Sequence, residues 1–143
     1  MRQAFGVPRG NREGIVIVPS SERPLAGKRG LVVDDEFLIV LDLEALLADS
    51  GAEIVCQGSS DKARAALDEG TFDFAIVDLH IGNGIDGGLS VATLLHERGI
   101  PFIFLSGVSS NDPQVTRFDA PLVEKPYRPE ALVETIRRLL DKQ

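Results

Sequence analysis

Residues 31–36 read LVVDDE, a short run of apolar and β-branched residues that ends in two adjacent aspartates. A second run, AIV at 75–77, ends in Asp78, and later apolar runs lead into Ser106 and Lys125. Such runs alternate with longer helix-like segments, which is typical of βαβ units with a parallel sheet. The carboxyl ends of parallel strands share one edge, where ligands bind in open α/β sheets. We therefore expect these polar residues to form a site.

The pattern predicts five strands and about five helices. The strands are expected near residues 30–33, 53–56, 74–77, 101–105 and 121–124. The last helix is the clearest, because Pro129 suits its first position and Leu132, Ile136 and Leu139 recur at three- and four-residue spacing. Residues 107–120 are rich in turn formers, so a helix there should be short or frayed.

The start of the chain differs in character from the rest. Glycine and proline are dense in residues 1–27, which predicts a flexible tail, and residues 28–143 are expected to form one globular domain. Within the tail, IVIV at 15–18 is β-prone. An added edge strand and a short, poorly anchored piece remain equally open there.

Composition narrows the function classes. The 143 residues are 43% hydrophobic and 26% charged, with no apolar stretch long enough to span a bilayer. The formal charge of −7 would repel nucleic acid phosphates, which argues against direct DNA binding. The single cysteine, Cys56, excludes an internal disulfide and is interpreted as a small core residue rather than a reactive thiol. We expect a cytoplasmic protein.

The acidic strand ends imply a cation. Carboxylates of Asp34, Asp35 and Asp78 on one edge would repel each other by about 4 kcal/mol per pair at an effective dielectric of ~20. Mg²⁺ meets this need, because few protein ligands are available and several positions would stay as water. Between such an ion and the Lys125 ammonium, Asp78 is suited to attack phosphorus, with a hydrogen bond from Ser106 to a phosphoryl oxygen.

Each of these residues also has a plainer interpretation. Asp34 and Asp35 could cap the following helix. Asp78 could form an Asx-turn, and Lys125 could simply lie in a loop. Their joint occurrence at successive strand ends favours the functional interpretation.

Taken together, four segments carry a resemblance to a known family. They read LVVDDE at 31–36, IVD at 76–78, LSG at 105–107 and EKPY at 124–127. From residue 28 onward the chain resembles the receiver domains of bacterial two-component response regulators. The resemblance implies an α/β, flavodoxin-like (βα)5 three-layer sandwich. Its parallel sheet would have the order 2-1-3-4-5, with two helices on one face and three on the other.

The resemblance also implies roles for individual residues, with Asp78 as the phosphorylated residue. Asp35 and Asp78 would bind Mg²⁺ directly, Asp34 through a water molecule, and His80 through its backbone carbonyl. The Ser106 hydroxyl and the Gly107 amide would contact the phosphoryl group, and Lys125 would pair with it.

Two departures from the family pattern stand out. The loop after Asp78 is one residue longer than usual and richer in glycine, so it should be more mobile. Leu122 occupies the position where typical receivers carry the aromatic switch residue. With the short fourth helix, these features resemble an alphaproteobacterial subgroup of single-domain receivers that pair with kinases of the HWE type. We expect residues 108–120 to become ordered on phosphorylation.

The apolar run FLIVL at 37–41 is wider than one buried helix face requires. In receivers this helix docks the partner's helices, so Phe37, Leu38 and Leu41 are predicted docking residues. Full burial of the run is the alternative.

The sequence thus predicts a phosphoacceptor that takes a phosphoryl group from a histidine kinase or histidine phosphotransfer protein. It is expected to be a stand-alone receiver, monomeric or weakly dimeric, that acts on a downstream protein without nucleic acid or membrane insertion. It would not be an enzyme beyond Mg²⁺-dependent self-phosphorylation and slow autodephosphorylation. The alternatives are a pseudo-receiver that binds partners without phosphorylation and an aspartyl-phosphate phosphatase. The phosphatase usually needs a second aspartate two residues after the nucleophile, where this chain has His80.

Overall fold

The computed structural model describes residues 23–142. Five strands alternate with five helices in that range. The strands are β1 (Arg29–Val33), β2 (Glu53–Gln57), β3 (Phe74–Asp78), β4 (Phe102–Ser106) and β5 (Leu122–Glu124). The helices are α1 (Phe37–Asp49), α2 (Ser60–Glu69), α3 (Asp86–Glu97), α4 (Pro113–Thr116) and α5 (Pro129–Asp141). The predicted strands agree with these bounds to within about a residue at each end.

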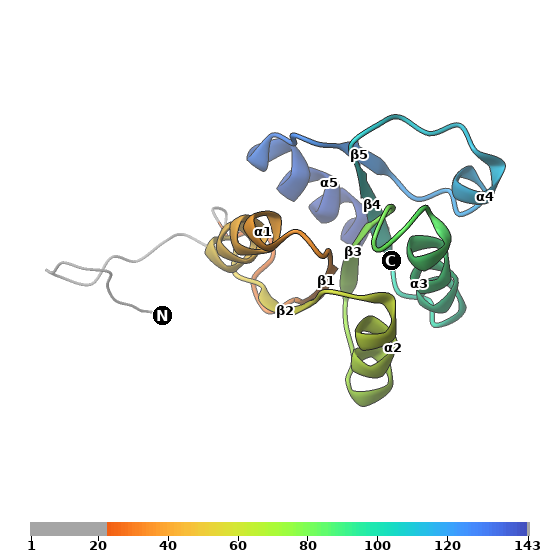
Figure 1. Ribbon diagram of the computed structural model, residues 1–143. Helices are drawn as coiled ribbons and strands as arrows, with labels where there is room; N and C mark the ends of the chain where they lie inside the picture. Colours follow the sequence, from red (N-terminus) through yellow and green to blue (C-terminus); the bar gives the residue numbers. More distant parts are fainter. Residues whose placement is uncertain (1–22, 143) are drawn as a thin grey trace, which may run out of the picture.

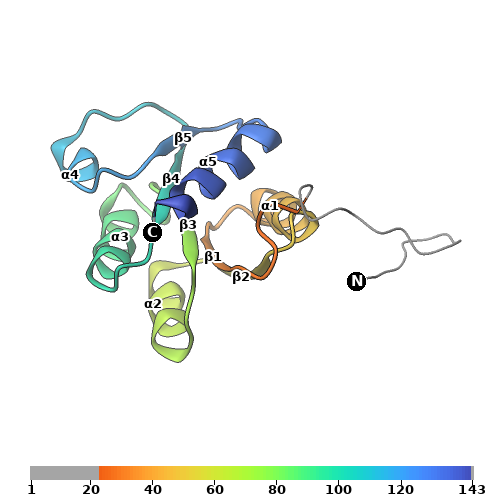
Figure 2. The ribbon, with the colours of Figure 1, turned by 180° about the vertical axis from the view of Figure 1, so that it is seen from behind.

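The strands form one parallel sheet in the order β2-β1-β3-β4-β5, which confirms the predicted topology. Figure 1 shows α1 and α5 on one face of the sheet and α2 and α3 on the other. The view from behind in Figure 2 shows the same three layers. Because all strands run the same way, their carboxyl ends lie along a single edge.

Successive side chains of each strand point to opposite faces of the sheet, so the core consists of two clusters, one on each face. In β1, Val32 packs toward α1 and α5, whereas Leu31 and Val33 pack toward α2 and α3. Every residue of β3 and β4 is buried, as expected for central strands covered on both faces. The side chains that end these two strands are therefore held by a rigid, packed sheet.

A close helix contact fixes the chain beside β3. Gly88, in the first turns of α3, lies so near the end of β3 that an added Cβ would come 2.5 Å from the Leu79 carbonyl oxygen. Only glycine lets the helix approach the backbone this closely. The segment that follows Asp78 is thus clamped on one side by α3.

The packed part of the chain begins earlier than the predicted boundary at Lys28. Leu25 is fully buried, and its amide donates to the Ser50 carbonyl at 2.9 Å. The Gly27 amide also donates to the Gly51 carbonyl at 3.3 Å. The boundary therefore moves back to at least Leu25. The possible strand at residues 15–18 and the rest of the predicted tail before Arg23 lie outside the described residues.

The fourth helix is a single turn, as the sequence predicts. Asp112 caps it by accepting a hydrogen bond from the Gln114 amide at 2.9 Å. Val115 and Phe118 anchor this segment by packing into the core on the α2 and α3 side. Within residues 23–142, no helix combines the length and the apolar character needed to cross a bilayer.

Candidate phosphoacceptor and metal site

Three aspartates meet at the carboxyl edge of the sheet. Asp34 directly follows β1, and Asp78 is the last residue of β3. One carboxylate oxygen from each of Asp34, Asp35 and Asp78 lies within 4.8 Å of the other two. Asp34 and Asp78 are buried, at 1% and 5% exposed, whereas Asp35 is exposed. The structure brings together the three carboxylates that the sequence predicts to meet.

Asp34 is the most deeply buried of the three aspartates. Its Oδ1 accepts a hydrogen bond from the Glu36 amide at 2.9 Å, which makes a local turn rather than a helix cap. Its buried Oδ2 has no hydrogen-bond partner among the described residues, although the Lys125 Nζ lies 3.3 Å away. Burial raises the pKa of Asp34, and the Asp78 charge adds to this, against the lowering effects of the Glu36 amide and Lys125.

This donor set fits a hard divalent cation. The three carboxylates supply closely spaced oxygens, and the orphaned buried Oδ2 of Asp34 needs positive charge that the lysine only partly provides. Mg²⁺ prefers oxygen ligands and keeps several waters, so a site open on the Asp35 side suits it.

Asp78 forms a short turn and still faces the pocket. Its Oδ1 accepts a hydrogen bond from the His80 amide at 3.0 Å, while its Oδ2 lies 3.7 Å from the Lys125 Nζ. The Asx-turn interpretation is therefore correct for one oxygen. The other oxygen points toward a cation, so the two interpretations are compatible.

Lys125, directly after β5, contacts three carboxylates at once. Its Nζ lies 2.7 Å from Glu36 Oε1, 3.3 Å from Asp34 Oδ2 and 3.7 Å from Asp78 Oδ2. Burial disfavours the ammonium, but the hydrogen bond to Glu36 and the charges of Asp34 and Asp78 outweigh it and raise the pKa of Lys125. The lysine therefore stays charged at neutral pH.

Glu36 is the residue of this site that sequence reasoning missed. It belongs to the LVVDDE segment, which was the available signal, but nothing local predicts that it reaches a lysine 89 residues away.

Ser106 ends the fully buried strand β4 and is itself fully buried. Its Oγ accepts a hydrogen bond from the Val108 amide at 3.2 Å, and its carbonyl accepts one from the Lys125 amide at 2.7 Å. These bonds tie the ends of β4 and β5 together. Ser106 is thereby held beside the cleft that Gly107 helps to line.

The cleft at this edge has a volume of about 520 Å³. Its lining residues come from four strand ends and the loops that follow them. They are Asp35, Glu36, Asp78, His80, Gly82, Gly107, Val108 and Lys125. The His80 side chain is exposed, and the predicted role of its carbonyl stays a prediction.

The longer loop after β3 reaches back to the acidic residues. Gly82 and Gly84 adopt positive φ values of 75° and 67°, which glycine accommodates without strain. The Gly82 amide donates to Asp35 Oδ2 at 3.3 Å. The extra residue in this loop thus comes with a direct contact to one of the predicted metal ligands.

Leu122 and the helix residues fall outside the acidic cluster. Leu122 is half-buried, pairs with Phe104 across the sheet and packs against the core, so this position holds an aliphatic side chain. Phe37, Leu38 and Leu41 on α1 are 71%, 77% and 46% exposed. The alternative of full burial for the FLIVL run is therefore wrong, and docking stays a prediction.

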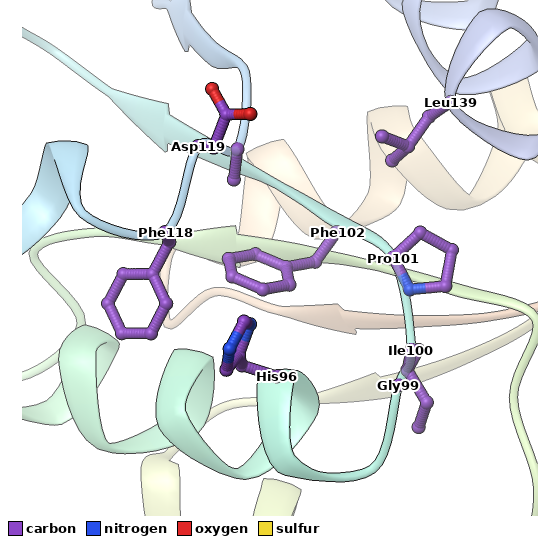
Figure 3. A pocket seen from close by; sticks show the side chains of 9 residues that line it. His96, Gly99, Ile100, Pro101, Phe102, Phe118, Asp119 and Leu139 are labelled. Carbon is purple, nitrogen blue, oxygen red and sulfur yellow. The ribbon is translucent and has the colours of Figure 1, made fainter. Parts of the chain in front are cut away.

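A second cavity, of about 280 Å³, lies at the opposite, amino-terminal end of β4. Figure 3 shows the His96, Phe102 and Phe118 rings gathered beside it, with Pro101 and Leu139 across the opening. Phe118 packs edge-on against Phe102, Phe104 and His96, with ring centroids 5.8 to 6.0 Å apart. Among the residues that the structure describes, no group of three carboxylates gathers at this end, and aromatic rings line it instead.

Comparison with known proteins agrees with this arrangement. Residues 31–137 match the family model of the response regulator receiver domain. The chain belongs to this family. The transcriptional regulatory protein DltR of Streptococcus agalactiae is 31% identical over 114 residues, which are 76% of this chain and 50% of DltR. The receiver chain therefore spans about half the length of this curated relative.

Solved structures share the fold. A CheY-like response regulator receiver domain protein from Methanospirillum hungatei is 24% identical with a TM-score of 0.74, covering 80% of this receiver and 94% of that chain. The response regulator PhyR from Brucella abortus is 26% identical with a TM-score of 0.70, over 86% and 52% of the two chains. The receiver domain of the Pseudomonas aeruginosa sensor histidine kinase PA1611, with magnesium in its active-site cleft, is 19% identical with a TM-score of 0.69. The match covers 81% of this chain and 99% of that chain.

Proposed function

We propose that this receiver domain accepts a phosphoryl group on Asp78 in a Mg²⁺-dependent reaction. The observation that carries the proposal is the convergence of three carboxylates and one ammonium at the carboxyl ends of β1, β3 and β5. A rigid edge of this kind positions a nucleophile and the charges around it before any donor arrives.

The chain's own groups define the transfer step. Asp78 Oδ2 attacks the phosphorus, and the bond from phosphorus to the donor breaks, so that its electron pair stays on the donor's leaving nitrogen or oxygen. The Lys125 ammonium and the Ser106 hydroxyl neutralise and hydrogen-bond the phosphoryl oxygens, and the Gly107 amide offers a further donor. Bound Mg²⁺ supplies the remaining positive charge for this group.

The receiver family implies which residues would hold the metal. Asp35 and Asp78 would hold Mg²⁺ directly, Asp34 through a water molecule and His80 through its carbonyl. The magnesium in the active-site cleft of the PA1611 receiver domain, which shares this fold, supports Mg²⁺ binding at this edge. The orphaned oxygen of Asp34 supports it independently.

The partners follow from the chemistry and from one exposed surface. The donor would be a histidine kinase, of the HWE type if the subgroup resemblance holds, or a histidine phosphotransfer protein. Phe37, Leu38 and Leu41 form an exposed apolar patch on α1, beside the acidic edge, that suits a partner helix. We propose a cytoplasmic receiver, monomeric or weakly dimeric, that acts on another protein and turns over no substrate beyond its own acyl phosphate.

Labelling with a small phosphodonor tests the proposal. The protein is incubated with acetyl phosphate, with Mg²⁺ or with EDTA, and its intact mass is measured. We expect one added phosphoryl group with Mg²⁺, little with EDTA and none in Asp78→Asn. Asp49→Asn, which changes an exposed aspartate at the end of α1, should label normally.

Two outcomes would replace the proposal. Absence of label in a folded, Mg²⁺-binding protein would favour a pseudo-receiver that binds its partner without phosphorylation. Label that survives in Asp78→Asn would move the acceptor to another residue.

A further inference from the structure

The position of the Lys125 ammonium is unexpected on electrostatic grounds. Asp34 is buried, and an ammonium stabilises a buried carboxylate more than an exposed one because the local dielectric is lower. Nevertheless the shortest contact of Lys125 is to Glu36, whose side chain is 59% exposed, at 2.7 Å. The contact to Asp34 is longer, at 3.3 Å, and Asp34 Oδ2 has no hydrogen-bond partner among the described residues.

The backbone explains why Glu36 can compete. The Glu36 amide donates to Asp34 Oδ1, so the turn before α1 holds Glu36 at the mouth of the cleft. The Lys125 amide donates to the Ser106 carbonyl, which fixes the origin of the lysine side chain at the end of β5. Both ends of the ion pair are thus anchored by backbone hydrogen bonds, and only the two side chains are free to rearrange.

We propose that Glu36 is a positioning residue that holds Lys125 back from Asp78 until a phosphoryl group competes for it. The inference rests on the proposed phosphoacceptor function of Asp78. Lys125 Nζ is 3.7 Å from Asp78 Oδ2, beyond hydrogen-bonding distance. In this role the ammonium exchanges its Glu36 contact for a phosphoryl oxygen when Asp78 is phosphorylated. The Glu36 contact therefore opposes formation of the phosphorylated state.

This role predicts opposite effects on two ligands. In Glu36→Gln, Mg²⁺ should bind more weakly, because a negative charge is lost and the released ammonium moves toward Asp34 and Asp78. A phosphoryl mimic should bind more tightly at saturating Mg²⁺, because Lys125 no longer has to leave a partner. A merely structural role for Glu36 would weaken both.

The test measures beryllofluoride affinity at saturating Mg²⁺, by the NMR change of the full chain. We expect Glu36→Gln to bind about two- to fivefold more tightly than the wild type, which is the strength of a partly exposed ion pair. Glu36→Asp keeps the charge but shortens the side chain, so it should show part of the gain. Glu44→Gln, which removes another exposed carboxylate of α1, should match the wild type.

Combining Glu36→Gln with Lys125→Ala separates the effect of the Glu36–Lys125 contact from the effect of losing one negative charge. In Lys125→Ala, the Glu36→Gln change should no longer increase beryllofluoride affinity beyond a small charge effect. An equal gain in that background, or equal or weaker binding in Glu36→Gln alone, would overturn the role of Glu36. Failure of the wild type to bind beryllofluoride with Mg²⁺ would instead contradict the phosphoacceptor function itself.

Discussion

The two ends of the central strands differ in what is buried there: charged side chains at the carboxyl end and aromatic rings at the amino end. At the carboxyl end, Asp34 and Asp78 are buried close together, and one Asp34 oxygen has no hydrogen-bond partner in residues 23–142. At the amino end of β4, the rings of Phe102 and Phe118 pack edge to face. Buried like charges cost stability, whereas packed rings supply it. The ring packing at the amino end of β4 therefore offsets part of the stability that the buried acidic edge costs.

Removing a ring from the amino end should give the largest effect. Phe118 is 8% exposed and contacts three other rings, so Phe118→Ala should lower the free energy of unfolding by about 3 kcal/mol. Urea unfolding measures the loss. Acetyl phosphate labelling of the folded fraction should persist, because Phe118 does not line the cleft at the acidic edge. A stability within 0.5 kcal/mol of the wild type, about the scatter of surface substitutions, would show that this ring packing does not stabilise the fold.

Cys56 lies close to the acidic edge of the sheet, and its reactivity should report the burial there. It lies on β2 and lines a small cavity with Asp34 and Asp35. Burial, with a smaller contribution from the Glu44 charge, raises the pKa of the Cys56 thiol to about 11. At neutral pH it should hold about a hundredfold less thiolate than an ordinary cysteine and react correspondingly slowly.

The measurement is the rate of disulfide exchange with a chromogenic reagent in the native protein and in urea. The native rate should increase with pH well beyond the ordinary thiol range. A native rate equal to the urea rate at neutral pH would contradict the raised pKa.

Neutralising the buried acid should have a smaller and opposite effect on stability. The pKa of Asp34 is raised in the folded, metal-free protein. The folded state therefore loses stability as the pH rises from the pKa of the unfolded chain to the raised pKa of the folded protein. Asp34→Asn should therefore stabilise the metal-free protein at neutral pH by about 1 kcal/mol and weaken Mg²⁺ binding.

The pH dependence of this stability gain shows whether it comes from removing the Asp34 charge or from a change in packing. The gain should shrink as the pH is lowered toward 3.8, where Asp34 is protonated in the unfolded wild type as well. Urea unfolding in EDTA at two pH values checks this, with Asp49→Asn as control. A less stable variant at neutral pH would show that the Lys125 contact outweighs burial.

Local pattern was enough to predict the sheet and the acidic cluster. Apolar runs mark the strands, and aspartates at the ends of parallel strands must meet at one edge. What depends on contacts between distant segments was missed. Leu25 lies among glycine and proline, and only its packing against the end of α1 buries it. Glu36 looks like an ordinary helix-start residue until β5 places Lys125 beside it.

Titration of the metal-free protein with Mg²⁺ measures whether the acidic edge binds a cation, as a phosphoacceptor role for Asp78 requires. Calorimetry should show one saturable site per chain in the wild type, and Asp35→Asn should lose most of the affinity while keeping the wild-type fold. No saturable uptake by the wild type, or equal uptake by Asp35→Asn, would contradict the account.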